Sequence, residues 1–475
     1  MLMQQKHGLF PNIIGKGDGA RQVADLLFRM RKEVAAGGDP ILNGTSMLGL
    51  MPSATIESLI IIDRGVDLAT VLLTQLTYEG LIDELVGIQN NQADVDTAVV
   101  GPAPSAPGSS SRTPAPTQPQ QGLKRKIQLD SSDKLYEQLR DSNFAIVGSL
   151  QNKVARRLKS DYESRHGAKS TTELREFVNK LPGYQAEQQS LKIHTGLTEE
   201  IMKHTTSEIF TRTLEVQQNL AAGTDPTSQH DSIEELIGRD APLEVVLRLL
   251  CLESCVAGGI RPKDLENFKR LILHAYGYQH LLTLDALEKM QLLQSRNSAG
   301  ILPIPAGGSR TNYAYLRKAL RLIVDEVNEQ NPNDIAYVYS GYAPLSVRLV
   351  QCILQKQYVL SITKGSNATN GISNASKGWT GFEDAVKSVA GATFDRKQSG
   401  EEKALKARQT LTGTGGRKTV VVFFLGGITF TEIAALRFIA KQEEARRQTI
   451  ICTTGIISGN RIMDAAVETA GFTKT

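Results

Sequence analysis

The chain has 475 residues, too many for one ordinary hydrophobic core, so we expect two or three domains. Hydrophobic residues make up 40% and charged residues 22% of it, close to the averages of globular proteins, which excludes a largely disordered scaffold. The formal net charge of +4 is spread along the chain rather than gathered in one basic block, so nucleic-acid binding is not indicated.

The cysteines and the apolar runs indicate the compartment. The four cysteines are too sparse for a disulfide framework, which fits a reducing cytosolic compartment. Cys251 and Cys255 lie one helical turn apart on an apolar face, where buried thiols are favoured over metal ligands. The start of the chain lacks a secretory pattern, and the apolar stretch 420–440 is interrupted by glycines and charges. We therefore predict a soluble protein, or one held only at the periphery of a membrane.

The first 100 residues alternate helix and strand patterns. A Gly-rich loop leads into a helix predicted over Ala20–Val34. A continuous β-branched run predicts a buried strand over Glu57–Ile62, and a helix is predicted over Leu68–Val86. A strand followed directly by a helix is typical of an α/β unit with a parallel sheet, so we assign residues 1–100 to the first half of a sheet domain.

Two zones lack the apolar residues that a packed core requires. Residues 101–128 include a run of Pro, Ser, Gly, Gln and Thr and are predicted to be a disordered loop. The basic cluster Lys124-Arg125-Lys126 near its end is interpreted as a solvated charge run rather than a targeting signal. Residues 365–416, rich in Ser, Asn, Gly and Lys, are predicted to be a mobile insertion.

Between these zones, residues 129–335 are almost wholly patterned as helices, and α/β signals then return. A helical block flanked by α/β segments favours insertion into one sheet domain, whose second half is residues 336–475. The predicted fold class is therefore α/β with a large inserted helical domain. In the second half we predict strands over Ile335–Tyr339, Val420–Leu425 and Thr449–Thr453, and a helix over Thr429–Lys441.

Two aspartates follow the first predicted strand. Asp63 and Asp67 could hold magnesium at the carboxyl end of a parallel strand, where open α/β sheets place their ligands. They stand four apart, however, with Arg64 between them, whereas metal-dependent phosphatases need a spacing of two. The structural alternative is that Arg64 pairs with these carboxylates and Asp67 caps the helix at Leu68.

Two Gly-rich turns are weak phosphate-binding candidates. Gly15-Lys16-Gly17-Asp18-Gly19 precedes a helix, and Gly426-Gly427 joins a strand to a helix, but neither completes a dinucleotide or P-loop motif. The seven histidines show no metal-binding spacing, and no serine lies in a nucleophile elbow. We predict no catalytic, cofactor or metal site. A nucleotide- or phosphate-handling α/β enzyme using Asp63, Asp67 and these turns stays the alternative.

Residues 170–205 indicate a partner surface. A helical pattern is interrupted at Leu181–Tyr184 and then resumes, with polar side chains around much of its circumference. One interpretation is an ordinary kinked core helix. The other is a projecting hairpin that accepts another helix along a groove.

Several long motifs together resemble the SM family of vesicle-fusion regulators, which bind SNARE proteins. They are similar above all to the branch of that family in the HOPS and CORVET tethering complexes. The resemblance implies an arch of three domains, of which this chain looks to lack the first. The motifs are Asp63–Thr70, Leu76–Asp83, Phe177–Pro182, Glu326–Pro332, Tyr337–Ser346 and Phe423–Phe438.

The resemblance implies partners, a location and site residues. An R-type SNARE is expected along the hairpin, with Qa-type binding weakened by the missing domain, in fusion at vacuolar, lysosomal and late endosomal membranes. A helical-solenoid subunit, vacuolar protein sorting-associated protein 16, is expected to contact Tyr339 and Tyr342, although core packing explains these tyrosines equally well. The expected SNARE-binding residues are Lys180, Leu181, Pro182, Tyr184, Gln185, Leu191 and His194.

Overall fold

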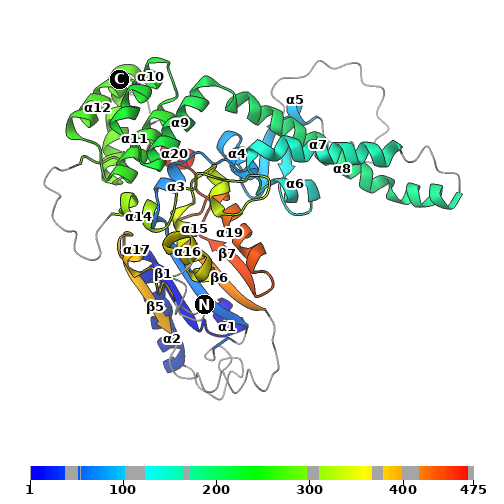
Figure 1. The fold of residues 1–475 in the computed structure, drawn as a ribbon, viewed down its shortest axis with the longest axis horizontal. Coiled ribbons are helices and arrows are strands. Elements are labelled where there is room, and N and C mark those ends of the chain that lie inside the picture. Colours follow the sequence, from blue (N-terminus) through cyan, green and yellow to red (C-terminus); the bar gives the residue numbers. More distant parts are fainter. Residues whose placement is uncertain are drawn as a thin grey trace.

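A computed structural model describes residues 2–37, 52–53, 55–101, 124–163, 171–296, 310–365, 378–397 and 417–468. A sheet flanked by helices lies at one end of the molecule, a group of helices lies at the other, and a pair of long helices projects sideways (Figure 1). The described chain thus combines an α/β unit with a helical block.

The central sheet has the strand order β5-β1-β2-β6-β7. Strands β1, β2, β6 and β7 run parallel, and β5 pairs antiparallel with β1 at one edge. Strand β2 lies in the middle, which explains its unbroken apolar run, because a parallel strand is covered on both faces. The strands are β1 Asn12–Lys16, β2 Ile56–Asp63, β5 Thr393–Lys397, β6 Lys418–Leu425 and β7 Arg447–Thr453.

Successive side chains of β2 enter different cores. Ile61 belongs to a cluster with Ala20 and Ala24 of α2, whereas Ile60 and Ile62 belong to the main core, which continues into the helical block. This is the two-residue alternation of a strand covered on both faces. The helices around the sheet are α1 Leu2–His7, α2 Asp18–Gly37, α15 Leu345–Leu354, α16 Lys356–Lys364, α17 Glu383–Lys387 and α19 Phe430–Glu443.

The helical block lies in sequence between two adjacent strands. Ile60 of β2 is in register with Val422 of β6, although the whole helical region separates them in the chain. The α/β fold with inserted helices is thereby confirmed, while the exact domain boundaries stay a prediction. The helices of the block are α9 Glu208–Ala222, α10 Thr227–Gly238, α11 Leu243–Ala257, α12 Pro262–Tyr276, α13 Leu281–Lys289 and α14 Tyr313–Ala319, with the 3-10 turn η4 Tyr278–His280. Helix α20 Gly459–Ala466 follows β7 in sequence but packs against α11 and α13 of the block.

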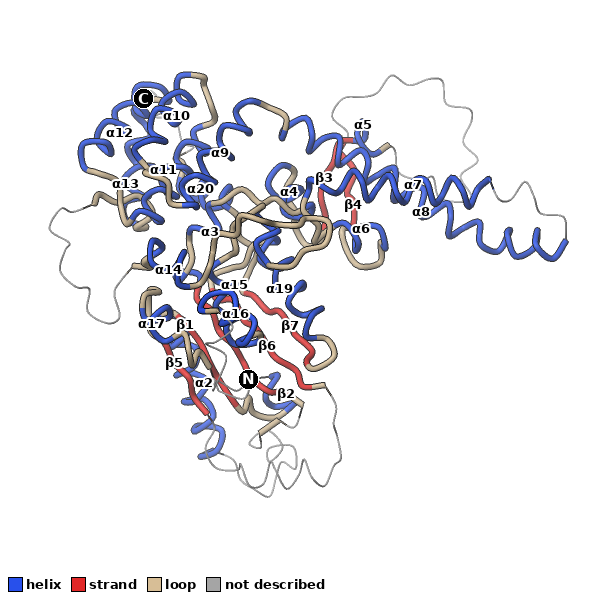
Figure 2. The backbone as a smooth tube through the Cα atoms, in the orientation of Figure 1, coloured by secondary structure: helices blue, strands red, loops and turns tan. Residues whose placement is uncertain are grey.

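The two long helices α7 and α8 form a projecting hairpin (Figure 2). Among the described side chains of the hairpin, those at its base pack on a separate hydrophobic cluster, which includes Tyr78, Tyr136 and Leu197. The elements of the hairpin and its base are α4 Tyr78–Leu85, β3 Gln92–Asp96, α5 Thr97–Val100, β4 Lys124–Gln128, α6 Lys134–Leu139, α7 Phe144–Glu163 and α8 Thr171–Thr205.

Two predicted loop regions contain ordered structure. Lys124 and Lys126 belong to β4, where they stand opposite Asp96 and Asp94 of β3. Opposite charges facing each other across an antiparallel pair stabilise it, so the predicted disordered loop 101–128 is wrong at its end. In the predicted mobile insertion 365–416, residues 378–397 supply α17 and the edge strand β5. The remaining residues of these two zones lie outside the described ones, apart from Gly101 and residue 365.

Two predicted elements differ in type or length. Ile335–Tyr339 forms the 3-10 helix η5 rather than a strand, because Asp334 accepts a hydrogen bond from the backbone of Ala336 and starts a helical turn. The helix predicted over Leu68–Val86 is divided into α3 Ala69–Leu72 and α4. Leu73 is extended, and Thr77 caps the new helix through the backbone N–H of Gly80.

Candidate functional site

Asp63 holds the Gly-rich loop rather than a phosphate. Its Oδ2 accepts a hydrogen bond of 2.7 Å from the backbone N–H of Gly19 at the start of α2, and its Oδ1 accepts one from Gly65. A Cβ atom added to Gly17, where φ is +107°, would lie 2.2 Å from the Cβ of Asp63. Gly17 and Gly19 are therefore explained by close approach to this carboxylate, which occupies the place that an anion would take at the helix N-terminus.

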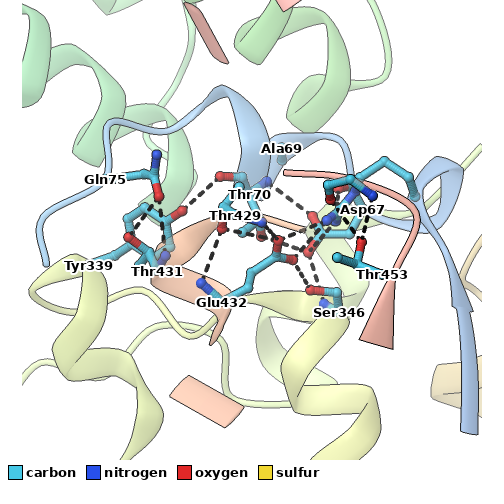
Figure 3. Close-up of polar contacts among 12 residues, drawn as sticks. Asp67, Ala69, Thr70, Gln75, Tyr339, Ser346, Thr429, Thr431, Glu432 and Thr453 are labelled. Carbon is cyan, nitrogen blue, oxygen red and sulfur yellow. Dashed lines mark hydrogen bonds and ion pairs between the residues drawn. The ribbon is translucent and has the colours of Figure 1, made fainter. Parts of the chain in front are cut away.

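The Asp67 carboxylate is fully buried and saturated with donors (Figure 3). Oδ1 accepts from the Thr70 N–H at 3.1 Å and the Tyr313 hydroxyl at 2.9 Å. Oδ2 accepts from the Thr70 hydroxyl at 2.6 Å and the Ser346 N–H at 2.8 Å. Asp67 was predicted to cap the helix at Leu68; it does accept a hydrogen bond from the N–H of Thr70 in the first turn of α3, although the N-cap position itself is Leu68. Donors on both oxygens leave no room for a magnesium ion.

Arg64 makes its strongest pairing with a residue far away in sequence. Its guanidinium contacts both oxygens of Glu432, at 3.0 and 2.8 Å, and lies 3.7 Å from Asp67. Burial alone would lower the pKa of Arg64, but Glu432 and Asp67 outweigh it and raise that pKa. The prediction that Arg64 pairs with neighbouring carboxylates missed Glu432, because no sequence pattern near Arg64 indicates a partner so far along the chain.

This network joins four segments and contains no catalytic group. Glu432 also forms the capping box of α19 with Thr429 and accepts a hydrogen bond from the Ser346 hydroxyl. Within the described ranges, no three His, Cys, Asp or Glu side chains are grouped so as to hold a metal ion. The carboxylates of the turn after β2 therefore hold segments of the protein together.

The outer part of the predicted SNARE-binding surface lies on the projecting hairpin. Helix α8 runs through Pro182 without a break, so the predicted interruption is wrong. Pro182 and Gln185 are exposed, and Leu181 and Tyr184 are half-buried. Lys180 belongs to the same helix, but its side chain lies outside the described part of the chain.

The inner part of that predicted surface, Leu191 and His194, lies at the base of the hairpin, where both side chains pack inward. His194 is 1% exposed, with Nδ1 2.9 Å from the Tyr78 hydroxyl and Nε2 3.2 Å from Asp133. Burial alone would raise the pKa of Asp133, but hydrogen bonds from His194 and Ser190 hold it well below its usual range. Leu191 is half-buried against the cluster at the hairpin base. His194 as a surface contact is therefore wrong.

Tyr339 and Tyr342 are only 4% and 6% exposed. The Tyr339 hydroxyl donates to the Thr70 carbonyl at 3.0 Å, and the Tyr342 hydroxyl lies 3.2 Å from the Thr70 hydroxyl. Their prediction as partner contacts is wrong, and the alternative of core packing is what the structure shows.

Two surfaces escaped the sequence analysis. The first, which we call the cleft, has a volume of about 960 Å³ and lies among α6, α7, α19, β7 and the segment 329–337. No local pattern predicts it, because its walls come from separate parts of the chain. The second, the apolar patch, consists of Tyr278, Leu281 and Leu282, which are 69%, 61% and 52% exposed. Its signal is an aromatic residue followed by two leucines outside the apolar stripe of their helix.

A comparison with models of protein families shows to which family the chain belongs. The model of the Sec1 family matches residues 1–465, nearly the whole chain. The chain belongs to the Sec1 family. The predicted resemblance to SM proteins is thereby confirmed.

Curated relatives of this Sec1-family chain are named for vacuolar protein sorting. Vacuolar protein sorting-associated protein 33A of Rattus norvegicus is 39% identical over 98% of the chain and 70% of its own length. Vacuolar protein sorting-associated protein 33 of Schizosaccharomyces pombe is 34% identical over 98% of the chain and 71% of its own length. These relatives place the chain in the vacuolar branch of the SM proteins.

Solved structures show the same fold. The Unc18–syntaxin 1 complex of Monosiga brevicollis has a TM-score of 0.58 at 15% identity, covering 98% of this chain and 69% of that one. The SM protein Vps45 in complex with the Qa SNARE Tlg2 has a TM-score of 0.57 at 16% identity, covering 96% of this chain and 65% of that one. The Sec1-family chain thus spans about two thirds of these solved chains.

SM proteins regulate vesicle fusion and are not enzymes, so this Sec1-family chain is a non-enzymatic protein of vacuolar vesicle traffic. None of the helices that the structure describes is both long and apolar enough to cross a bilayer.

Proposed function

We propose that this Sec1-family protein binds SNARE proteins and promotes their assembly as a subunit of a HOPS- or CORVET-type tethering complex. It would act on the cytoplasmic side of vacuolar, lysosomal and late endosomal membranes. The observation that carries the proposal is the α7–α8 hairpin, which projects from the body (Figure 1). Ile146 and Leu150 of α7 also line the cleft. The solved relatives of this fold include complexes with a Qa SNARE and with syntaxin 1, which supports SNAREs as the partners.

The hairpin suits an R-type SNARE helix. Helix α8 has 35 residues, which corresponds to roughly 50 Å of rigid surface. Arg157 of α7 pairs with Glu187 of α8 at 2.7 Å, so the two helices are tied together beyond the base. Leu181, Tyr184 and Gln185, three and four residues apart, lie on one side of α8 and offer a face along which a partner helix can lie.

The cleft suits a second SNARE helix, for which we propose the Qa type. Its walls include apolar residues, among them Ile146, Leu150 and Phe438, beside charged ones. Arg437, in the wall of the cleft, is already paired within the protein with Glu79 and Asp141. An amphipathic helix with an apolar stripe and polar flanks matches such a wall.

Binding of a soluble R-type SNARE motif, measured by isothermal titration calorimetry, tests the hairpin. Tyr184→Asp should weaken binding at least tenfold, because it places a charge in the face that the partner covers. Lys203→Ala is the matched control, since Lys203 is exposed on the same helix outside the proposed face. Equal affinity of the wild-type and Tyr184→Asp proteins would contradict the hairpin as the binding surface.

For the solenoid subunit, vacuolar protein sorting-associated protein 16, we propose the apolar patch as the docking surface. Three adjacent exposed apolar side chains are unusual on a monomer and are typical of an interface. Leu281→Asp should abolish co-purification with that subunit while circular dichroism stays unchanged. Leu26→Asp is the matched control, because Leu26 is 52% exposed on α2 of the sheet unit. Loss of the subunit in both variants, or in neither, would refute the assignment.

A further inference from the structure

The hairpin is long compared with the base that holds it. From His194 at the base to Leu181 on the outer part, α8 rises by roughly 20 Å, at about 1.5 Å per residue. A tilt of about 10° at the base would displace the outer part by roughly 3–4 Å, a large fraction of the roughly 8–10 Å between two packed helices. The contacts at the base therefore decide where the outer face of the hairpin lies relative to the body.

His194 joins both helices of the hairpin to the body. Its Nδ1 lies 2.9 Å from the hydroxyl of Tyr78 in α4, and its Nε2 lies 3.2 Å from the carboxylate of Asp133. An ionised carboxylate can only accept, so Nε2 carries a hydrogen and donates it to Asp133. The backbone carbonyl of His194 accepts a hydrogen bond of 3.0 Å from the side chain of Gln151 in α7. One residue of α8 thus contacts α7, α4 and the start of α6.

Asp133 makes a second link between α8 and α6. It is the N-cap of α6, where its Oδ1 accepts from the backbone N–H groups of Leu135 and Tyr136. Ser190, one turn outward from His194 on α8, donates its hydroxyl to the same carboxylate, at 2.8 and 2.7 Å from the two oxygens. Hydrogen bonds to a charged acceptor are stronger than those between neutral groups, so this carboxylate holds α8 against α6.

Helix α6 is also connected to the cleft. The Tyr136 hydroxyl donates to Glu79 at 2.7 Å, and Glu79 in turn accepts from Arg437 of α19 at 3.1 Å. Arg437 donates as well to Asp141, just beyond the C-terminal end of α6, at 2.7 Å. The element that holds the hairpin is thus itself fixed to the cleft wall. The cleft-lining residues of α6 and the turn after it are Glu137, Gln138, Arg140 and Asp141.

We propose that Asp133, acting through His194 and Ser190, is a positioning residue that sets the direction in which the hairpin projects relative to the cleft. A helix on the outer face of the hairpin and a helix in the cleft would then lie at a fixed separation, which favours their assembly. In this respect the inference rests on the proposed function. The positioning itself belongs to the free protein and can be measured without a SNARE.

Double electron–electron resonance on the full chain measures the direction of the hairpin. Spin labels are placed at Ala186→Cys on the outer hairpin and at Lys441→Cys in the cleft wall, both exposed positions, after the half-buried Cys255 and Cys452 are replaced by serine. Asp133→Asn keeps the cap of α6, because asparagine caps a helix as well as aspartate does, but it removes the charge and the oxygen that faces His194. The width of the distance distribution should about double in this variant.

Ser190→Ala is the second variant, and it decides the test if Asp133→Asn does not fold. It removes one half-buried hydroxyl and should widen the distribution by about half. Asp130→Asn is the matched control, because the Asp130 carboxylate binds Ser132 rather than α8, and it should leave the width unchanged. An unchanged width in both Asp133→Asn and Ser190→Ala, or equal widening in Asp130→Asn, would overturn the proposal.

Calorimetry distinguishes positioning from direct contact. The affinity of Asp133→Asn for a soluble R-type SNARE motif should stay within about twofold of wild type, because the outer face is unchanged. A loss of about tenfold would make Asp133 part of the binding surface and would also overturn the proposal. If the wild-type chain binds no SNARE motif, the proposed function fails, whereas the distance comparison still decides whether Asp133 positions the hairpin.

Discussion

At the turn after β2, both oxygens of the Asp67 carboxylate accept hydrogen bonds inside the protein, whereas Pro182 and Gln185 on the outer part of α8 face solvent. The turn is rich in charged side chains, but these side chains bind groups of distant segments within the protein. In the hairpin, the described side chains that pack on the hydrophobic cluster lie at its base. Charged residues after a strand thus do not by themselves indicate chemistry, while an exposed helical face indicates recognition.

The largest effect is expected at Tyr342, next to the turn. Tyr342→Asp places a carboxylate in a site that is 6% exposed and removes the contact with Thr70, so we expect a loss of more than about 4 kcal/mol of stability. Thermal unfolding followed by circular dichroism measures it, with Leu281→Asp as the folded control. If the Tyr342→Asp protein is well folded, Tyr342 is not part of the core, and the turn differs less from the hairpin than its hydrogen bonds indicate.

A second effect concerns the Arg64–Glu432 pair. Arg64→Met leaves the fully buried Glu432 carboxylate without its cation and should cost about 3–5 kcal/mol in urea unfolding. Arg21→Met is the matched control, because the Arg21–Asp25 pair is exposed and should contribute less than about 1 kcal/mol. If both variants lose the same free energy of unfolding, the buried Arg64–Glu432 pair contributes no more to stability than the exposed Arg21–Asp25 pair.

A third effect depends on pH and concerns Lys16, at the end of β1. Burial lowers the pKa of Lys16 to about 8, since its Nζ donates only to uncharged groups, the Gly391 carbonyl and the Thr393 hydroxyl. Between pH 8 and about 10.4 the unfolded chain holds this proton and the folded chain does not, so stability rises with pH there. Relative to Lys16→Met, the wild type should gain about 1–2 kcal/mol across this window, after allowance for solvent screening. A constant difference between the two proteins would show that Lys16 is solvated.

The smallest effect on global stability is expected in the hairpin. Pro182 lies inside α8, where proline removes one backbone hydrogen bond, so Pro182→Ala should strengthen the helix locally. Hydrogen exchange around residues 178–186 should slow about tenfold or more, while the melting temperature of the body stays unchanged, because the outer hairpin packs against little else. A shift in global melting would show that hairpin and body unfold together, so that the hairpin is not independent of the body.

Much of the fold was predictable where local pattern and environment agree. The apolar run of β2 and the interleaved helical stretch were recognised because period and length distinguish them. Residues 124–128 and 393–397 were missed because their composition is that of a loop, and only pairing with another strand makes them β. Ile335–Tyr339 was assigned to a strand because five apolar residues do not distinguish a strand from a short buried helix.

The candidate site divides in the same way. For Asp63, Arg64 and Asp67 the sequence favoured a structural role, because their spacing differs from that of metal-dependent phosphatases and Asp67 precedes a helix. The hairpin was recognised from its polar circumference. His194 and Tyr342 were misplaced because polarity and aromaticity in sequence do not tell which way a side chain faces.

The sequence by itself determined the class of fold, the family and the absence of a complete catalytic motif, since all three depend on residue types and short-range spacing. Only the tertiary structure decided that Glu432 neutralises Arg64, that two tyrosines are core, and that a cleft and an apolar patch exist. These features arise where chain segments hundreds of residues apart pack together, and exposure and pairing at such contacts follow from three-dimensional packing rather than from local pattern.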